Sequence, residues 1–148
     1  MILIGIATNW DYKRCNATKV RGEVMEVRVI KNGNSNIAII SSEEVIINNA
    51  QDALDLIATI HYEYNCDKMI INKKSITEDF FELKNGIAGE IMQKHINYNM
   101  PLAIVGEFES YDSKSLRSLI YEPNKGNKIV FKSTEEEAIE SLAEGNRL

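Results

Sequence analysis

The chain has few cysteines, few prolines and no long apolar run. Its two cysteines, Cys15 and Cys66, are too few for a disulfide framework and lack the spacing of a zinc site. We therefore expect a reducing, cytoplasmic setting and no metal or other cofactor. The opening apolar stretch, residues 1–7, is too short to cross a bilayer and has no basic residues before it. We expect neither a signal peptide nor a membrane partner.

Basic charge is also scarce. Seventeen Lys and Arg stand against 22 Asp and Glu, which gives a net charge of −5. A surface that binds duplex nucleic acid needs clustered Lys and Arg, so we expect no nucleic-acid partner. With 44% hydrophobic and 26% charged residues, the composition is that of an ordinary globular domain. A chain of 148 residues is long enough to bury one good core.

From Met25 onward the apolar residues recur in regular patterns. Residues 25–30 alternate as in a strand, and a second apolar run follows at 36–40. Asn32-Gly33 between them is a strong signal for a hairpin turn. We therefore expect the first two strands of the domain to be antiparallel neighbours.

Short apolar runs then alternate with amphipathic segments. Strand cores are predicted within residues 68–72, 101–108 and 124–133. Helices are predicted within 48–65, with Asn49 as its cap, 75–99, with a break at Asn85-Gly86, 113–122 and 133–145. Capping boxes are predicted for Ser75 with Glu78 and for Ser133 with Glu136. This order predicts an α/β fold, in which helices pack on a mixed, mostly parallel sheet with an N-terminal β-hairpin.

Residues 1–24 lack these patterns and carry four basic but only two acidic residues. Arg21-Gly22-Glu23 can be encoded by a purine-rich string that resembles a bacterial ribosome-binding site just before Met25. We hypothesise that residues 1–24 are a translated upstream region and that residues 25–148 form the single domain. The alternative is an ordinary N-terminal arm, which could add a strand through residues 1–7. A native peptide that covers Trp10 would contradict the late start.

Several long runs resemble a bacterial family known only as domain of unknown function 4180. The resemblance extends from Ile37 to Leu142. Its matching runs are QDALDLIA, CDKMIINKKSITEDFFELKNGIAGEI, LAIVGEFESYDSKSLRSLIYEPNKG and STEEEAIESL. More distantly, the strand–helix order resembles that of STAS and SpoIIAA-like domains. That resemblance implies a compact α/β module of the kind found in anti-sigma-factor antagonists and in regulatory or ligand-sensing appendages.

In phosphorylatable STAS domains a serine lies between the third strand and the following helix. The matching junction here offers Ser75 and Thr77 as candidate phosphoacceptors. It lacks the Asp-Ser-Ser-Gly pattern, and Lys84-Asn85-Gly86 at the closest position has no hydroxyl. The departure weakens the case for a phosphoswitch, and simple helix capping is the alternative for both residues.

Ligands of open parallel sheets gather beyond the carboxyl ends of the strands, where helix N-termini offer free amides. Two stretches place cations, hydroxyls or glycine there. Their candidate contacts for an anion or another ligand are Gly106, Ser113, Ser115, Arg117 and Lys125. The alternative is that these residues only cap a helix, form a turn or carry solvated charge.

The leading hypothesis is a non-catalytic, STAS-like regulator that binds a protein partner or a small anionic ligand at this edge of the sheet. No catalytic residue is predicted, because His61 and His95 are isolated and no nucleophile elbow or phosphate loop is present. One alternative is a small hydrolase-like enzyme. Another is a ligand-sequestering protein of a mobile element or phage, with a pocket lined by residues 80–92. A homodimer through the hairpin edge is a further expectation.

Overall fold

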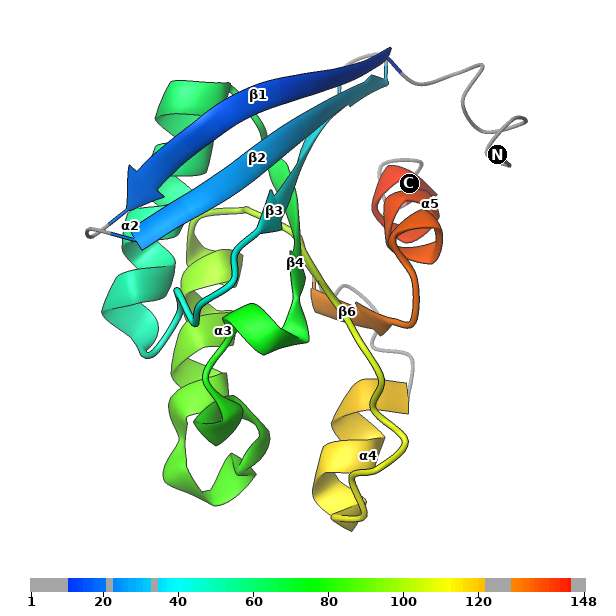
Figure 1. The fold of residues 1–148 in the computed structure, drawn as a ribbon. Coiled ribbons are helices and arrows are strands. Elements are labelled where there is room, and N and C mark those ends of the chain that lie inside the picture. Colours follow the sequence, from blue (N-terminus) through cyan, green and yellow to red (C-terminus); the bar gives the residue numbers. More distant parts are fainter. Residues whose placement is uncertain (1–10, 21–22, 33–34, 122–128, 145–148) are drawn as a thin grey trace.

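The computed structural model describes residues 11–20, 23–32, 35–121 and 129–144 of the chain. Within them, six strands form one sheet in the order β1-β2-β3-β4-β5-β6 (Figure 1). The strands are β1 (Asp11–Val20), β2 (Glu23–Asn32), β3 (Ser35–Ser41), β4 (Lys68–Asn72), β5 (Leu102–Val105) and β6 (Ile129–Lys132). The described helices are α2 (Ala50–Tyr64), α3 (Ile87–Asn97), α4 (Lys114–Tyr121) and α5 (Glu135–Glu144).

The predicted N-terminal hairpin is formed by β2 and β3. The two strands pair antiparallel, from Glu26 opposite Ser41 to Asn32 opposite Ser35. Strands β3, β4, β5 and β6 then pair parallel in the order of the sequence. The predicted fold class is therefore confirmed: an α/β fold with a mixed, mostly parallel sheet, an N-terminal hairpin and helices packed on the sheet.

Strand β1 is not predicted by the sequence. It pairs antiparallel with β2, and its register shifts between Arg14 and Ala17. Because backbone groups make this pairing, an edge strand can form without apolar alternation. β1 also occupies the hairpin edge that we expected a second copy to use. The strand suggested at residues 1–7 lies outside the described residues, and the domain start at Met25 stays a prediction, although β2 already begins at Glu23.

The two faces of the sheet are covered differently. Side chains on one face, such as Ala38 and Ile40, pack with α2, α3 and α4 in the larger core cluster. Side chains on the other face, such as Ile37 and Ile39, pack with α5 in a smaller cluster. Figure 1 shows α5 on the opposite side of the sheet from α2 and α3. The three crossover helices share a face because the chain moves across the parallel strands in one direction, and crossovers have one hand.

The segment after β4 differs from its prediction. Instead of the short helix predicted between Ser75 and the break at Asn85-Gly86, it forms three 3-10 turns, η1 (Lys73–Ser75), η2 (Glu78–Phe81) and η3 (Leu83–Asn85), and α3 starts after Gly86. Ser75 does not cap a helix, because it is buried and its Oγ donates to Ser42 O at 3.2 Å. Thr77 is the cap, since its Oγ1 accepts from Asp79 N. The predicted break at Asn85-Gly86 is confirmed, and Gly86 has a φ of 82°.

The caps of the other helices follow from local hydrogen bonds. Asn49 caps α2 as predicted, because its Oδ1 accepts from Asp52 N at 2.9 Å. The box predicted for Ser133 and Glu136 is wrong by one residue. Thr134 Oγ1 accepts from Glu137 N at 3.2 Å, and the Glu137 carboxylate accepts from Ser133 N at 3.3 Å.

Candidate functional site

Two cavities open where the parallel strands end. Cavity 1 has a volume of about 340 Å³ and lies between the ends of β3, β4 and β5 and the start of α5. Cavity 2 has a volume of about 430 Å³ and lies between the ends of β4, β5 and β6. Asn72 and Val105 line both, so the two cavities adjoin at the edge where ligands of parallel sheets gather.

The base of cavity 1 is apolar. It is formed by Ile39, Ile70 and Val105, which come from three neighbouring strands and point to the α5 face of the sheet. These side chains are only 2%, 1% and 7% exposed, so they are held firmly by the core around them. An apolar base with a few polar groups at its rim is the usual composition of a small-molecule site.

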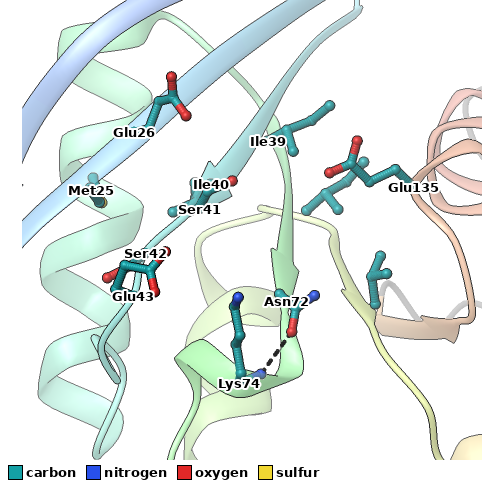
Figure 2. Close-up of a pocket in the computed structure, with 12 residues that line it drawn as sticks. Met25, Glu26, Ile39, Ile40, Ser41, Ser42, Glu43, Asn72, Lys74 and Glu135 are labelled. Atoms are coloured by element: carbon teal, nitrogen blue, oxygen red, sulfur yellow. Dashed lines mark hydrogen bonds between the residues drawn. The ribbon is translucent and has the colours of Figure 1, made fainter.

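Three hydrogen-bond donors stand at the rim of cavity 1. Asn72 Oδ1 accepts from Lys74 N at 2.9 Å, which leaves the amide Nδ2 directed away from this turn. Figure 2 shows the Lys74 side chain rising from the turn after β4 beside Asn72, while Ser41 lies at the end of β3. The Lys74 ammonium, the Asn72 Nδ2 and the Ser41 hydroxyl have no hydrogen-bond or ion-pair partner among the described residues. They are therefore available to a ligand.

Three carboxylates also line cavity 1. Glu135, at the start of α5, is bound by Arg28 of β2, with Nη2 and Oε2 2.6 Å apart. Glu26 lies on β2, two positions before Arg28 and on the same face of the sheet. Glu43 follows β3, is exposed and has no ion pair with any described residue.

Cavity 2 has an aromatic wall and acids that are already engaged. Phe108 and Phe131 meet edge to face, with ring centroids 5.5 Å apart. The Glu107 carboxylate accepts from Glu109 N at 2.6 Å, and the Glu137 carboxylate accepts from Ser133 N. These carboxylates therefore hold the loops around the cavity.

A network of Lys73, Tyr111 and Glu78 lies beside cavity 2. The Lys73 ammonium donates to Tyr111 Oη at 3.0 Å and to Glu107 O at 2.9 Å, and it stands 4.5 Å from the Tyr111 ring centroid. Tyr111 Oη donates to Glu78 Oε2 at 2.8 Å. Burial, followed by the hydrogen bond to Glu78 and its negative charge, raises the pKa of Tyr111. The phenol thus stays protonated and joins the segment after β4 to the loop after β5.

The residues proposed as phosphoacceptors do not line either cavity. Ser75 is fully buried beneath the segment after β3, where it is bonded to the Ser42 carbonyl. Thr77 is partly exposed and caps η2. Neither residue lines cavity 1 or cavity 2.

Of the proposed ligand contacts, the structure brings one to a cavity. Gly106 lines cavity 2, whereas Ser113, Ser115 and Arg117 are exposed on α4 or just before it and line neither cavity. Ser113 Oγ accepts from Leu116 N at 3.3 Å, as expected of a cap. Arg117 donates to Tyr111 O at 3.1 Å, and its guanidinium lies 5.2 Å from the Tyr121 ring centroid. Lys125 lies outside the described residues.

The rim donors of cavity 1 were missed by the sequence reasoning. Ser41, Asn72 and Lys74 each come at or just after the end of a buried strand, so the strand-end rule itself points to them. In sequence, the hydroxyl, cation and glycine pattern near α4 is more typical of an anion site. The edge was predicted, but the residues were not.

The two histidines lie apart from both cavities. His95, on α3, is fully buried, and its Nδ1 donates to Met100 O at 3.0 Å. Burial lowers the pKa of His95 to about 4, against the opposing effect of that hydrogen bond. His61 is exposed on α2. Among the described residues, no group of three or more His, Cys, Asp or Glu side chains could hold a metal ion. In the same part of the chain, every helix is too short or too polar to cross a bilayer.

The comparisons with known proteins bear on the expected family. No curated protein matches the chain. The model of a family described as a domain of unknown function (DUF4180) matches residues 32–142. This range holds β3 to β6 and the rim donors of cavity 1, whereas β1 and nearly all of β2 lie before it. Because the match covers well over half of its length, the chain belongs to the DUF4180 family.

Proposed function

We propose that this chain is a non-catalytic, cytoplasmic, STAS-like regulatory module that binds the anionic group of a small ligand or partner in cavity 1. One observation carries the proposal. The Lys74 ammonium, the Asn72 amide and the Ser41 hydroxyl stand at one cavity without partners among the described residues. Donors of this kind form charge-assisted hydrogen bonds with a carboxylate or phosphate.

Location and resemblance support the proposal. Ser41 and Asn72 are the last residues of two adjacent parallel strands, β3 and β4, which give them a rigid base, and Lys74 follows in η1. The strand–helix order that suggested a STAS-like regulator is also the order of the folded chain. A phosphoswitch at Ser75 has no support, because the hydroxyl is fully buried, and Thr77 remains the accessible candidate.

The two alternatives have less support. A hydrolase needs a general base beside a nucleophile, and neither His61 nor His95 lines cavity 1 or cavity 2. A sequestering pocket lined by residues 80–92 matches neither cavity 1 nor cavity 2. The large side chains of that segment, Phe80, Phe81 and Ile91, are buried in the main core instead.

A titration with one anionic probe tests the proposed function. N-acetyl-L-leucine combines a carboxylate with an apolar side chain that suits the base of cavity 1. Added to the ¹⁵N-labelled chain, it should shift the amide resonances of residues 41–43 and 72–74. Lys74→Gln should weaken binding about tenfold or more, because it removes a hydrogen bond to a charged group.

Lys84→Gln is the matched control, since Lys84 is an exposed cation that does not line cavity 1. It should bind the probe as the unchanged chain does. Absence of shifts at residues 41–43 and 72–74, or equal binding by the Lys74→Gln and Lys84→Gln variants, would show that cavity 1 is not the anion site.

A further inference from the structure

We infer that the ligand of cavity 1 is a short aliphatic monocarboxylate. Lys74, Asn72 and Ser41 bind its carboxylate, and the apolar base of the cavity binds its chain. This inference rests on the proposed function, because the same three donors hold the anionic group in both. It adds which anion is bound, and it adds the nature and the length of the group that carries the anion.

The positive charge at the rim matches a single negative charge. Lys74 carries the only ammonium or guanidinium among the described residues that line cavity 1, and the other two donors, Asn72 and Ser41, are neutral. A carboxylate brings one negative charge, whereas a phosphate monoester brings about 1.5–2 at neutral pH. One ammonium and two neutral donors therefore compensate a carboxylate better than a phosphate.

The helix start at cavity 1 does not favour a phosphate either. Protein sites for phosphate commonly use the free amides of a helix N-terminus. At the start of α5, where Glu135 lines the cavity, Thr134 Oγ1 already accepts from Glu137 N. The first turn of α5 also carries three glutamates, which complement the helix dipole themselves. The N-terminus of α5 therefore has little to offer a dianion.

The base of cavity 1 determines what kind of group carries the carboxylate. It consists of Ile39, Ile70 and Val105, and no aromatic side chain is found among the described residues that line the cavity. Stacking on aromatic rings is how proteins commonly hold nucleobases and other flat rings. A branched aliphatic chain makes its apolar contacts without such rings. The base therefore favours an aliphatic group over an aromatic one.

The spacing of residues along the strands sets the length of this group. In β3, Ile39 stands two residues before Ser41, and in β4, Ile70 stands two residues before the donor Asn72. Side chains two residues apart point to the same face and are separated by about 7 Å along the strand. With carbon–carbon bonds of about 1.5 Å, a chain of about five carbon atoms reaches from the donors to the base. Figure 2 shows the corresponding separation between Ile39 and the pair of Asn72 and Lys74.

The volume of cavity 1 agrees with this length. A volume of about 340 Å³ is near the lower limit of small-molecule sites. A branched acid of about five carbons in its main chain suits such a cavity better than a nucleotide or a long fatty acid does.

Four probes separate the charge from the chain. 4-Methylpentanoate carries a carboxylate on a branched aliphatic tail. 3-Methylbutyl phosphate and 4-methylpentanamide carry the same tail on a phosphate and on a neutral amide, and acetate carries the carboxylate without the tail. In NMR or calorimetric titrations of the full chain, 4-methylpentanoate should bind about tenfold tighter than each of the other three.

Two substitutions assign the parts of the probe to the parts of the cavity. Lys74→Gln should weaken binding of 4-methylpentanoate about tenfold and leave 4-methylpentanamide unchanged. Val105→Thr places a hydroxyl in the apolar base, so it should weaken 4-methylpentanoate several-fold and leave acetate unchanged. Val130→Thr is the control, because Val130 is half-buried against the same core cluster but does not line cavity 1.

Some outcomes overturn the inference alone. If 3-methylbutyl phosphate or acetate binds through Lys74 as tightly as 4-methylpentanoate does, the ligand is not an aliphatic monocarboxylate and the anion site stands. The same holds if N-acetyl-L-leucine binds through Lys74 and 4-methylpentanoate does not. If Val105→Thr and Val130→Thr affect 4-methylpentanoate equally, the base does not hold the chain. Circular dichroism shows whether both valine variants fold, and if Val105→Thr does not, the comparison with acetate decides this point.

Other outcomes overturn both proposals. If 4-methylpentanamide binds as tightly as 4-methylpentanoate and Lys74→Gln changes neither, cavity 1 recognises no negative charge. If none of the anionic probes shifts the resonances of residues 41–43 and 72–74, cavity 1 binds no anion of either kind.

Discussion

At Gly106 the backbone passes beneath the side chain of Lys73. A Cβ atom placed on Gly106 would stand 2.9 Å from Lys73 Cδ, 3.0 Å from Cγ and 3.1 Å from Cβ. The far end of the same lysine is fixed by its bonds to Glu107 O and Tyr111 Oη. Because the stem is held at both ends, it cannot move aside cheaply. Glycine at this position therefore makes room for Lys73, which is a structural reason distinct from the ligand contact that its position suggested.

We predict that Gly106→Ala lowers the free energy of unfolding by about 1–3 kcal/mol, as overpacking does elsewhere. Urea denaturation measures this. Gly89→Ala is the matched control, because a Cβ there meets no atom within 4 Å and Gly89 lies inside α3. That change should be neutral or stabilise the chain by about 0.5–1 kcal/mol. Equal effects of the two substitutions would contradict the steric explanation.

His95 gives the fold a dependence on pH. Burial lowers its pKa from 6.5 to about 4, so between these values the unfolded chain binds more protons than the folded chain does. We predict that the stability tied to neutral His95 is complete above pH 6.5 and is lost as the pH falls toward 4. The total loss should be about 3 kcal/mol.

Unfolding by urea at a series of pH values between 7 and 4, each about half a unit apart, tests the effect of His95. His95→Leu should show a shallower decline than the unchanged chain over this range. His61→Leu, which removes an exposed histidine from α2, is the control and should retain the steeper decline. Parallel curves for the His95→Leu variant and the unchanged chain would mean that His95 does not cause the decline.

At the scale of elements, the Lys73–Tyr111–Glu78 network joins two segments that follow different strands. Lys73 and Glu78 follow β4, and Tyr111 lies between β5 and α4. The Tyr111 ring also stacks on Phe81 of η2, with centroids 5.0 Å apart and an angle of 15° between the rings. The network therefore fixes the loop that borders cavity 2.

We predict that Tyr111→Phe destabilises the chain by about 1 kcal/mol, because the stacked ring remains and only the hydroxyl bonds are lost. A double-mutant cycle with Glu78→Gln should give a coupling of about 0.5–1.5 kcal/mol. Tyr62→Phe is the control, since Tyr62 is 81% exposed on α2, and it should have no measurable effect. A cycle without coupling would show that the Tyr111–Glu78 bond does not stabilise the chain.

The elements differ in how far the sequence predicts them. Strand β5 is wholly apolar and β4 has an apolar centre at residues 69–71, and both strands are covered on both faces, so composition alone identifies them. The caps at Thr77 and Thr134 were assigned to Ser75 and Ser133 instead, because each of these serines has a glutamate three residues later in the sequence. In each pair, the residue that becomes the cap depends on where the preceding strand ends. β1 could not be predicted, because residues 11–20 have no apolar alternation and form a strand through backbone pairing with β2.

The candidate site is predictable only in part. Its edge follows from the order of strands and helices, which local patterns reveal. Its residues do not, because Lys74 and Asn72 have nothing unusual in sequence around them. They become a site only when β3 stands beside β4 and the start of α5 closes the cavity with Glu135, and these contacts join residues far apart in the chain.

At the scale of the whole molecule, β1 covers the outer edge of β2. We predict that a chain starting at Met25 still folds, because the core residues of β2 remain and Met25 and Val27 are at most 1% exposed. Loss of β1 leaves a row of unpaired backbone groups along β2, which invites pairing between copies. Light scattering after gel filtration should therefore show more self-association for the shorter chain than for the full one at equal concentration.

If the shorter chain remains as monomeric as the full chain, the edge of β2 is not an association surface. If it fails to give a cooperative unfolding transition, β1 is part of the folding unit and the hypothesis of a native start at Met25 is contradicted. Circular dichroism during heating distinguishes these results.

The order of the strands in the sheet is their order in the sequence, and this affects how the sheet can form. Each strand from β2 to β6 pairs with the strand synthesised just before it. The sheet can therefore grow by one strand at a time as the chain leaves the ribosome, and no strand has to insert between two that are already paired. The cover of the second face, α5, is synthesised last of the described helices. Until it emerges, Ile39, Ile70 and Ala103 stay uncovered on the nascent chain. The nascent chain thus passes through a short period with an exposed apolar surface, which chaperones can bind and through which copies can aggregate.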